Sequence, residues 1–211
     1  MHMLTDLDVV ALDAEAVRAS VALVARATPA DLALPTPCAD WTLHGLITHM
    51  AAQHYGFAAA SAGDGDPARW RPRRLGGDPA AAYAAAADTV LAAFRADGVL
   101  ERRFPLPDFA AGPAFPARQA ISFHLVDYVA HSWDVARTLG LQPRFSPRLL
   151  AAALPAALAV PGGGARLAPG AAFAPAVTAG DGPPLDQIIA ALGRDPGWRS
   201  PARAAAAGAA P

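Results

Sequence analysis

Most of the six histidines of this 211-residue chain fall in two stretches that have the pattern of helices. In one of them Asp127 precedes His131 by four residues. On a helix this spacing places both side chains on one face, about 6 Å apart along the axis, so that they can bind one ion together. Helical bundles commonly add a further ligand from a facing helix. His49, midway along the other stretch, is the predicted third ligand of a divalent metal ion.

The same residues also have a structural interpretation. A single histidine on an apolar helical face is commonly a hydrogen-bonded core residue, and His49 adjoins predicted core positions. Asp127 is harder to explain in this way, because a carboxylate buried among apolar neighbours requires a cation or a metal. Arg118 and Arg137 of the same stretch are nine and ten residues away, too far along the axis to pair with it. The pattern alone leaves both interpretations open.

We expect the remaining histidines and the single cysteine to have roles other than binding the metal. His124 precedes Asp127 by three residues, so we expect it to line a pocket or to support a ligand. His44 is expected at the surface, and His54 off the core stripe of its helix. Cys38 follows a proline near a helix start, where a structural position is favoured over a thiolate ligand.

Composition narrows the classes of function. Hydrophobic residues make up 54% of the chain and charged residues 17%, which predicts a folded globular protein. The net charge of −1 argues against nucleic acid or an anionic membrane as a partner. All 17 basic residues are arginine, which excludes chemistry that needs a lysine. The absence of a readable signal peptide or membrane span favours the cytoplasm.

Helix periodicity and boundary signals place six elements along the chain. They are expected at residues 7–27, from Asp40 or Thr42 to about 62, at 79–97, 116–139, 147–158 with an internal Pro155, and 185–192. The core stripe of the second would hold Leu43, Leu46, Ile47 and Met50. This pattern predicts an all-α fold, a four-helix up-down bundle with extra short helices and a Pro/Gly-rich C-terminal segment. Residues 1–199 would form one domain, and 200–211 a disordered tail.

Three segments resemble a known family. Residues 36–50 (TPCADWTLHGLITHM) and 127–140 (DYVAHSWDVARTLG) resemble the two signatures of the metal-binding domain of mycothiol-dependent maleylpyruvate isomerase, within the DinB-like helical-bundle superfamily. Residues 173–198 are similar to the tail of a single-domain actinobacterial subgroup described as metal-binding proteins. The resemblance extends from about residue 7 to residue 198.

The resemblance implies the same ligands as the spacing, namely His49, Asp127 and His131. The isomerase has a glutamate where this chain has Asp127, whose shorter side chain implies a different affinity or metal choice. Two imidazoles and one carboxylate suit Zn²⁺ with an open coordination position, although Fe²⁺ and Ni²⁺ also fit. Asp134 is expected to orient a histidine as a hydrogen-bond acceptor, and Trp133 to pack.

The implied activity is that of a mycothiol-dependent isomerase or thiol transferase, acting on a small electrophile through a metal-activated thiolate. The isomerase has a second domain with no counterpart here, so maleylpyruvate is not the expected substrate. Arg118 and the arginine-rich loop at 69–74 are candidates for binding an acidic substrate or the thiol, with solvated surface charge as the alternative. A non-catalytic metal- or ligand-binding bundle, and a biosynthetic enzyme using the metal as a Lewis acid without a thiol, also remain open. A homodimer is left open too.

Overall fold

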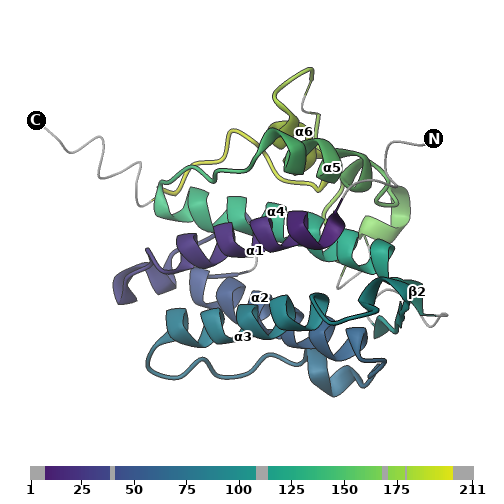
Figure 1. Ribbon diagram of the computed structural model, residues 1–211. Helices are drawn as coiled ribbons and strands as arrows, with labels where there is room; N and C mark the ends of the chain where they lie inside the picture. Colours follow the sequence, from purple (N-terminus) through teal and green to yellow (C-terminus); the bar gives the residue numbers. More distant parts are fainter. Residues whose placement is uncertain (1–7, 39–40, 108–113, 168–170, 179, 202–211) are drawn as a thin grey trace, which may run out of the picture.

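The computed structural model describes residues 8–38, 41–107, 114–167, 171–178 and 180–201 (Figure 1). His2 and residues 202–211 of the predicted tail lie outside the described residues. The described chain is mostly helical, as expected. Its α-helices are α1 (Val9–Val24), α2 (Leu43–Ser61), α3 (Pro79–Phe94), α4 (Ala117–Leu139), α5 (Pro147–Leu158) and α6 (Pro184–Ala191).

Side-chain caps fix where the helices begin. Thr42, one of the two candidates for the start of α2, accepts a hydrogen bond from the backbone N–H of Gly45. Asp78 caps α3 and Ser146 caps α5 in the same way, each directly before the proline that begins its helix. Helix α4 ends at Gly140, whose φ of 71° is the left-handed conformation that glycine adopts most readily.

Two features of the described chain were not predicted. The dipeptides β1 (Arg103–Phe104) and β2 (Phe115–Pro116) pair as antiparallel strands just before α4. Short 3₁₀ turns lie in the connections between helices, among them Pro29–Ala33 between α1 and α2. These elements are too short to carry a periodic signal in the sequence.

Helix packing brings α2 and α4 together, which is what the candidate site requires. Helix α1 packs against α4 and α3, and α2 packs against α3 and α4. Helices α5 and α6 pack on each other, and α5 lies on α4, on the side away from α2 and α3 (Figure 1). The four predicted core residues of α2 are fully buried: Leu43, Leu46, Ile47 and Met50.

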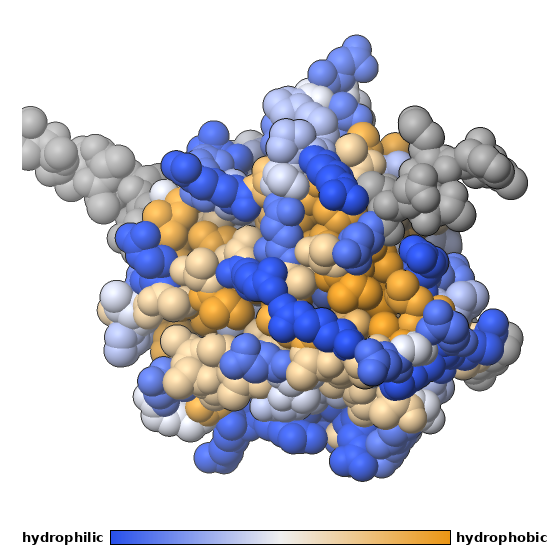
Figure 2. Space-filling model, in the orientation of Figure 1, coloured by the Kyte–Doolittle hydropathy of each residue, from blue (hydrophilic) through white to orange (hydrophobic). Residues whose placement is uncertain are grey.

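The surface is mixed in character. On the face that carries α1, apolar areas are broken up by hydrophilic side chains (Figure 2). Within the described ranges, no helix combines the length and apolarity needed to cross a membrane.

Candidate metal centre

The structure brings together the three side chains proposed as ligands. His49 on α2 and Asp127 and His131 on α4 each offer one ligand atom, and these atoms all lie within 4.8 Å of one another. Nε2 of His131 is 3.3 Å from Oδ1 of Asp127. The His49 and His131 rings meet edge to face, with centroids 5.3 Å apart. Two imidazoles and a carboxylate at this spacing suit one divalent transition-metal ion, so the residues present fit a resident metal.

The site lies at the edge of the core rather than deep inside it. His131 is buried, and His49 is partly buried. The side chain of Asp127 is 20% exposed, so this carboxylate is less buried than its apolar neighbours in the sequence suggested. Asp127 lies at the margin of the contact between α4 and α2, where one side remains open to solvent.

An aromatic residue covers His49. The Trp41 ring lies 4.3 Å from that of His49 and 6.2 Å from that of His131, measured between centroids. Trp41 comes immediately before Thr42, the cap of α2, so the turn that starts the helix also places the indole. Burial, followed by the nearby His131, lowers the pKa of His49 to about 4. His49 is therefore neutral near pH 7, and its lone pair is available to a metal.

Asp134 orients His131. The Nδ1 atom of His131 lies 3.0 Å from Oδ2 of Asp134, one helical turn further along α4. Burial alone would raise the pKa of Asp134, but the Arg194 guanidinium and His131 outweigh it and hold the pKa below its usual value. The ionised carboxylate accepts the Nδ1 proton, and this contact turns Nε2 of the ring toward Asp127. The orienting role expected for Asp134 is thus present in the geometry.

Arg194 is a participant that the sequence interpretation missed. It follows α6, is 5% exposed and donates to both carboxylate oxygens of Asp134, with the Nη2–Oδ2 distance at 2.9 Å. The two residues are 60 positions apart, so no local spacing relates them. The weak signal was the glycine before it, Gly193, which marks a helix end followed by a charged residue.

His124 and His54 belong to a second, fully buried polar cluster that joins four helices. Nδ1 of His124 on α4 is 2.6 Å from Oδ1 of Asp13 on α1, and its Nε2 is 3.2 Å from Nδ1 of His54 on α2. Nε2 of His54 in turn lies 3.3 Å from the Tyr83 hydroxyl on α3, which lies 2.6 Å from the Ser20 hydroxyl on α1. His54 is therefore a core residue, contrary to expectation, and both ring nitrogens of His124 are engaged within the core.

The hydrogen bonds of this cluster have a definite direction. Ser20 donates its one proton to a backbone carbonyl one turn earlier, so the Tyr83 hydroxyl donates to Ser20. His54 then donates to Tyr83 from Nε2 and accepts at Nδ1 from His124. Burial, followed by His124, holds the pKa of His54 well below its usual value, in keeping with a neutral ring. His124 donates to His54 from Nε2, and its Nδ1 shares a proton with Asp13, whose pKa is raised by burial.

The other candidate residues lie apart from the ligand atoms. Arg118 is exposed in the first turn of α4, about 14 Å along the axis from Asp127. Sγ of Cys38 lies 3.9 Å from Nη2 of Arg194, and Cys38 is not among the clustered ligands. His44 is exposed, as expected.

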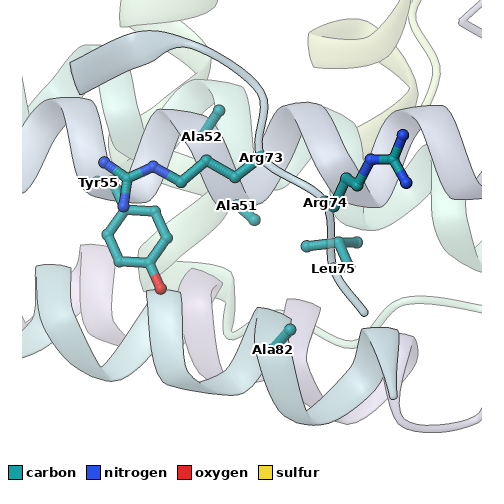
Figure 3. Close-up of a pocket in the computed structure, with 7 residues that line it drawn as sticks. All are labelled: Ala51, Ala52, Tyr55, Arg73, Arg74, Leu75 and Ala82. Atoms are coloured by element: carbon teal, nitrogen blue, oxygen red, sulfur yellow. The ribbon is translucent and has the colours of Figure 1, made fainter. Parts of the chain in front are cut away.

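Arg73 and Arg74 of the arginine-rich loop line a small pocket beside α2, which we call the outer pocket. The pocket has a volume of about 100 Å³, with Ala51, Ala52, Leu75 and Ala82 as its apolar lining. Arg73 lies over the Tyr55 ring, 4.8 Å from the centroid, while Arg74 extends the opposite way along α2 (Figure 3). Arg69 is paired with Asp64.

Comparison with known proteins agrees with these observations. The family model described as "Mycothiol maleylpyruvate isomerase N-terminal domain" matches residues 14–136, which include all three candidate ligands. Two Mycobacterium tuberculosis proteins are 33% identical to this chain over 177 residues, covering 83% of it and 92% of each relative. They are "Uncharacterized protein MT0763" of strain CDC 1551 / Oshkosh and "Uncharacterized protein Rv0738" of strain ATCC 25618 / H37Rv. No solved structure matches the chain significantly. The chain belongs to the mycothiol maleylpyruvate isomerase N-terminal domain family.

Proposed function

We propose that this protein binds one divalent metal ion, Zn²⁺ by preference over Fe²⁺ or Ni²⁺, through His49, Asp127 and His131. We further propose that it uses the ion in mycothiol-dependent isomerisation or thiol transfer on a small electrophile. The observation that carries the proposal is the convergence of three ligand atoms from two helices within 4.8 Å. We also propose that helices α1–α4 form a four-helix up-down bundle.

The residues around the cluster favour a reactive site over a closed structural one. Three protein ligands leave a coordination position free, whereas structural zinc sites take four. A divalent metal in such a site lowers the pKa of a bound thiol, so that the thiol acts as a nucleophile near neutral pH. The exposed side of Asp127 gives a thiol its approach, and Trp41 shields His49. Asp134 keeps the His131 ring in the orientation that directs Nε2 to the cluster.

The pocket beside Tyr55 is the proposed position for the acidic part of a substrate or for a polar part of the thiol. Ala52 in its lining is three residues after His49, so the two lie about 4.5 Å apart along the axis of α2. Arg73 and Arg74 are exposed, and among the described residues neither forms an ion pair with an acid. They are therefore available to an anionic group, while the alanines and Leu75 accept its apolar portion.

Metal analysis tests the first part of this proposal. Protein purified without chelators should contain about one divalent metal ion per chain, and His49→Ala and His131→Ala should lose it. His44→Ala is the matched control, because His44 is exposed on the same helix as His49. A wild-type protein that binds none of Zn²⁺, Fe²⁺ and Ni²⁺ would contradict the proposal.

A thiol assay separates the enzymatic function from its alternatives. The metal-loaded protein is incubated with mycothiol and a panel of small electrophiles, and both free thiol and electrophile isomers are measured. Metal-dependent turnover that requires mycothiol supports the proposal. Metal binding without turnover indicates a binding bundle, and turnover without thiol indicates a Lewis-acid enzyme.

A further inference from the structure

The C-terminal segment reaches the candidate metal centre through one buried arginine. Arg194 lies beyond the part of the chain that the family model matches, residues 14–136. It is placed by Gly193, whose φ of 80° ends α6 in a left-handed turn. A Cβ atom on Gly193 would lie 2.4 Å from the backbone oxygen of Ala174, so no other residue fits there without movement. The turn therefore directs Arg194 inward.

The contacts of Arg194 form a fixed clamp on Asp134. Its Nε atom lies 3.2 and 3.3 Å from the two carboxylate oxygens, and Nη2 lies 2.9 Å from Oδ2. Nη1 donates to the backbone carbonyl of Leu192 at 3.0 Å, and the Phe173 ring lies 5.5 Å from Cζ. These contacts engage all three nitrogens of the guanidinium and one of its faces. An arginine engaged in this way fixes the plane of the carboxylate as well as its charge.

Asp134 transmits that orientation to a proposed ligand. Its side chain is fully buried, and the Oδ2 atom that receives Nη2 of Arg194 also lies 3.0 Å from Nδ1 of His131. Without the guanidinium, the carboxylate would be a buried charge with His131 as its remaining side-chain partner, and it could rotate or draw water into the core. The His131 ring would then lose its fixed tilt.

We infer that Arg194 is a positioning residue of the metal centre, acting through Asp134 on His131, so that the segment after the matched domain completes the site. The inference rests on the proposed function, because it requires His131 to bind a metal. Partners of this kind, one contact removed from a ligand, typically change metal affinity by about 10–100-fold when lost.

The test measures metal binding by the full-length chain. Zn²⁺ affinity is determined by competition with a chelating indicator, and the visible absorption spectrum of the Co²⁺-loaded protein reports ligand geometry. Arg194→Met should weaken Zn²⁺ binding about 10–100-fold and alter the Co²⁺ spectrum. Arg199→Met is the control, because Arg199 is exposed in the same segment and bonds only to nearby backbone carbonyls. It should leave affinity and spectrum unchanged.

The same change made in an Asp134→Asn variant shows whether Arg194 acts on Zn²⁺ affinity through Asp134. In an Asp134→Asn protein, adding Arg194→Met should cause little further loss of affinity, since the clamped carboxylate is already gone. An equal loss in both backgrounds would overturn the inference. If Arg194→Met does not fold, Arg194→Lys decides. Lysine keeps the charge but lacks the planar guanidinium, so the Zn²⁺ affinity should fall several-fold. A Zn²⁺ affinity and a Co²⁺ spectrum equal to those of the wild-type protein would overturn the inference.

Failure of the inference can be told apart from failure of the proposed function. Wild-type protein that binds Zn²⁺, together with a folded Arg194→Met variant of equal affinity and spectrum, rejects the role of Arg194 alone. Wild-type protein that binds no metal rejects both.

Discussion

The hydroxyl of Tyr128 donates a hydrogen bond to the backbone carbonyl of Met50. Tyr128 follows Asp127 on α4, and Met50 follows His49 on α2, so this bond joins the two helices directly beside their proposed ligands. We therefore expect this bond to help set the distance between the two halves of the candidate centre.

Tyr128→Phe should loosen this spacing while leaving the helices formed. We expect a loss of about 1 kcal/mol in the free energy of unfolding, typical of one hydrogen bond, together with weaker Zn²⁺ binding. Urea unfolding and chelator competition measure the two effects. Tyr55→Phe is the control, because Tyr55 lies at the outer pocket of α2. Unchanged Zn²⁺ affinity in Tyr128→Phe would show that the bond does not set the spacing.

Removing Asp13 should destabilise the buried polar cluster. The change Asp13→Leu leaves Nδ1 of the buried His124 without its partner, which typically costs about 1–3 kcal/mol of unfolding free energy. Asp88→Leu, at an exposed position on α3, should cost well under 1 kcal/mol. The measurement is urea unfolding at pH 7. A loss no larger than that of Asp88→Leu would show that the contact between Asp13 and His124 does not stabilise the fold.

The sequence was sufficient to predict what depends on local signals. Thr42 and Asp78 are caps whose effect extends over three residues, and both helix starts were predicted. Asp127 and His131 share one helix, so their proximity follows from spacing alone. The third ligand, His49, was one of three histidines on the other long histidine-bearing helix, and the resemblance to the family implied the same residue.

Long-range contacts could not be predicted from the sequence. Asp13 and His124 are 111 residues apart, and nothing near either residue indicates the other. His54 was expected outside the core because only one narrow face of its helix was assumed to be buried. In the structure α3 and α4 both pack on α2, so a wider arc of that helix is buried.

Stability at high pH should be governed by two buried tyrosines. Burial raises the pKa of Tyr83 and of Tyr128 above the ordinary value of 10.0. A group with a raised folded-state pKa stabilises the fold below its unfolded pKa, and this stability is lost as pH rises through 10. The chain has no lysine, so few other groups titrate in this window. Above about pH 10.5 the unfolding free energy should fall by about 2.7 kcal/mol per pH unit, since two protons are released on unfolding.

The variant Tyr83→Phe identifies the source of this slope. It should halve the slope to about 1.4 kcal/mol per pH unit, measured by urea unfolding between pH 10 and 12. An unchanged slope would show that Tyr83 ionises in the folded protein as it does in the unfolded chain.

Gly56 is required by close packing rather than by backbone conformation. A Cβ atom at this position in α2 would lie 2.3 Å from the Trp70 ring, which covers the helix there. Gly56→Ala should therefore displace Trp70 and cost about 1–3 kcal/mol, although alanine favours the helix. Tryptophan fluorescence and urea unfolding test this, with Gly45→Ala as the control because its Cβ would meet nothing closer than 3.6 Å. An increase in stability for Gly56→Ala would contradict the packing argument.

The two arginines of the outer pocket, Arg73 and Arg74, should matter only for anionic ligands. If the pocket binds an acidic group, Arg73→Gln with Arg74→Gln should raise KM for an acidic electrophile about tenfold, close to the loss of one charge-assisted hydrogen bond. KM for a neutral electrophile of similar size, the Zn²⁺ affinity and kcat should stay near wild type, because neither arginine contacts the ligand cluster. Arg18→Gln, at an exposed position on α1, is the charge-matched control for each arginine. An equal rise in KM for both electrophiles would point to a general disturbance of the loop, and no rise would leave these arginines as solvated surface charge.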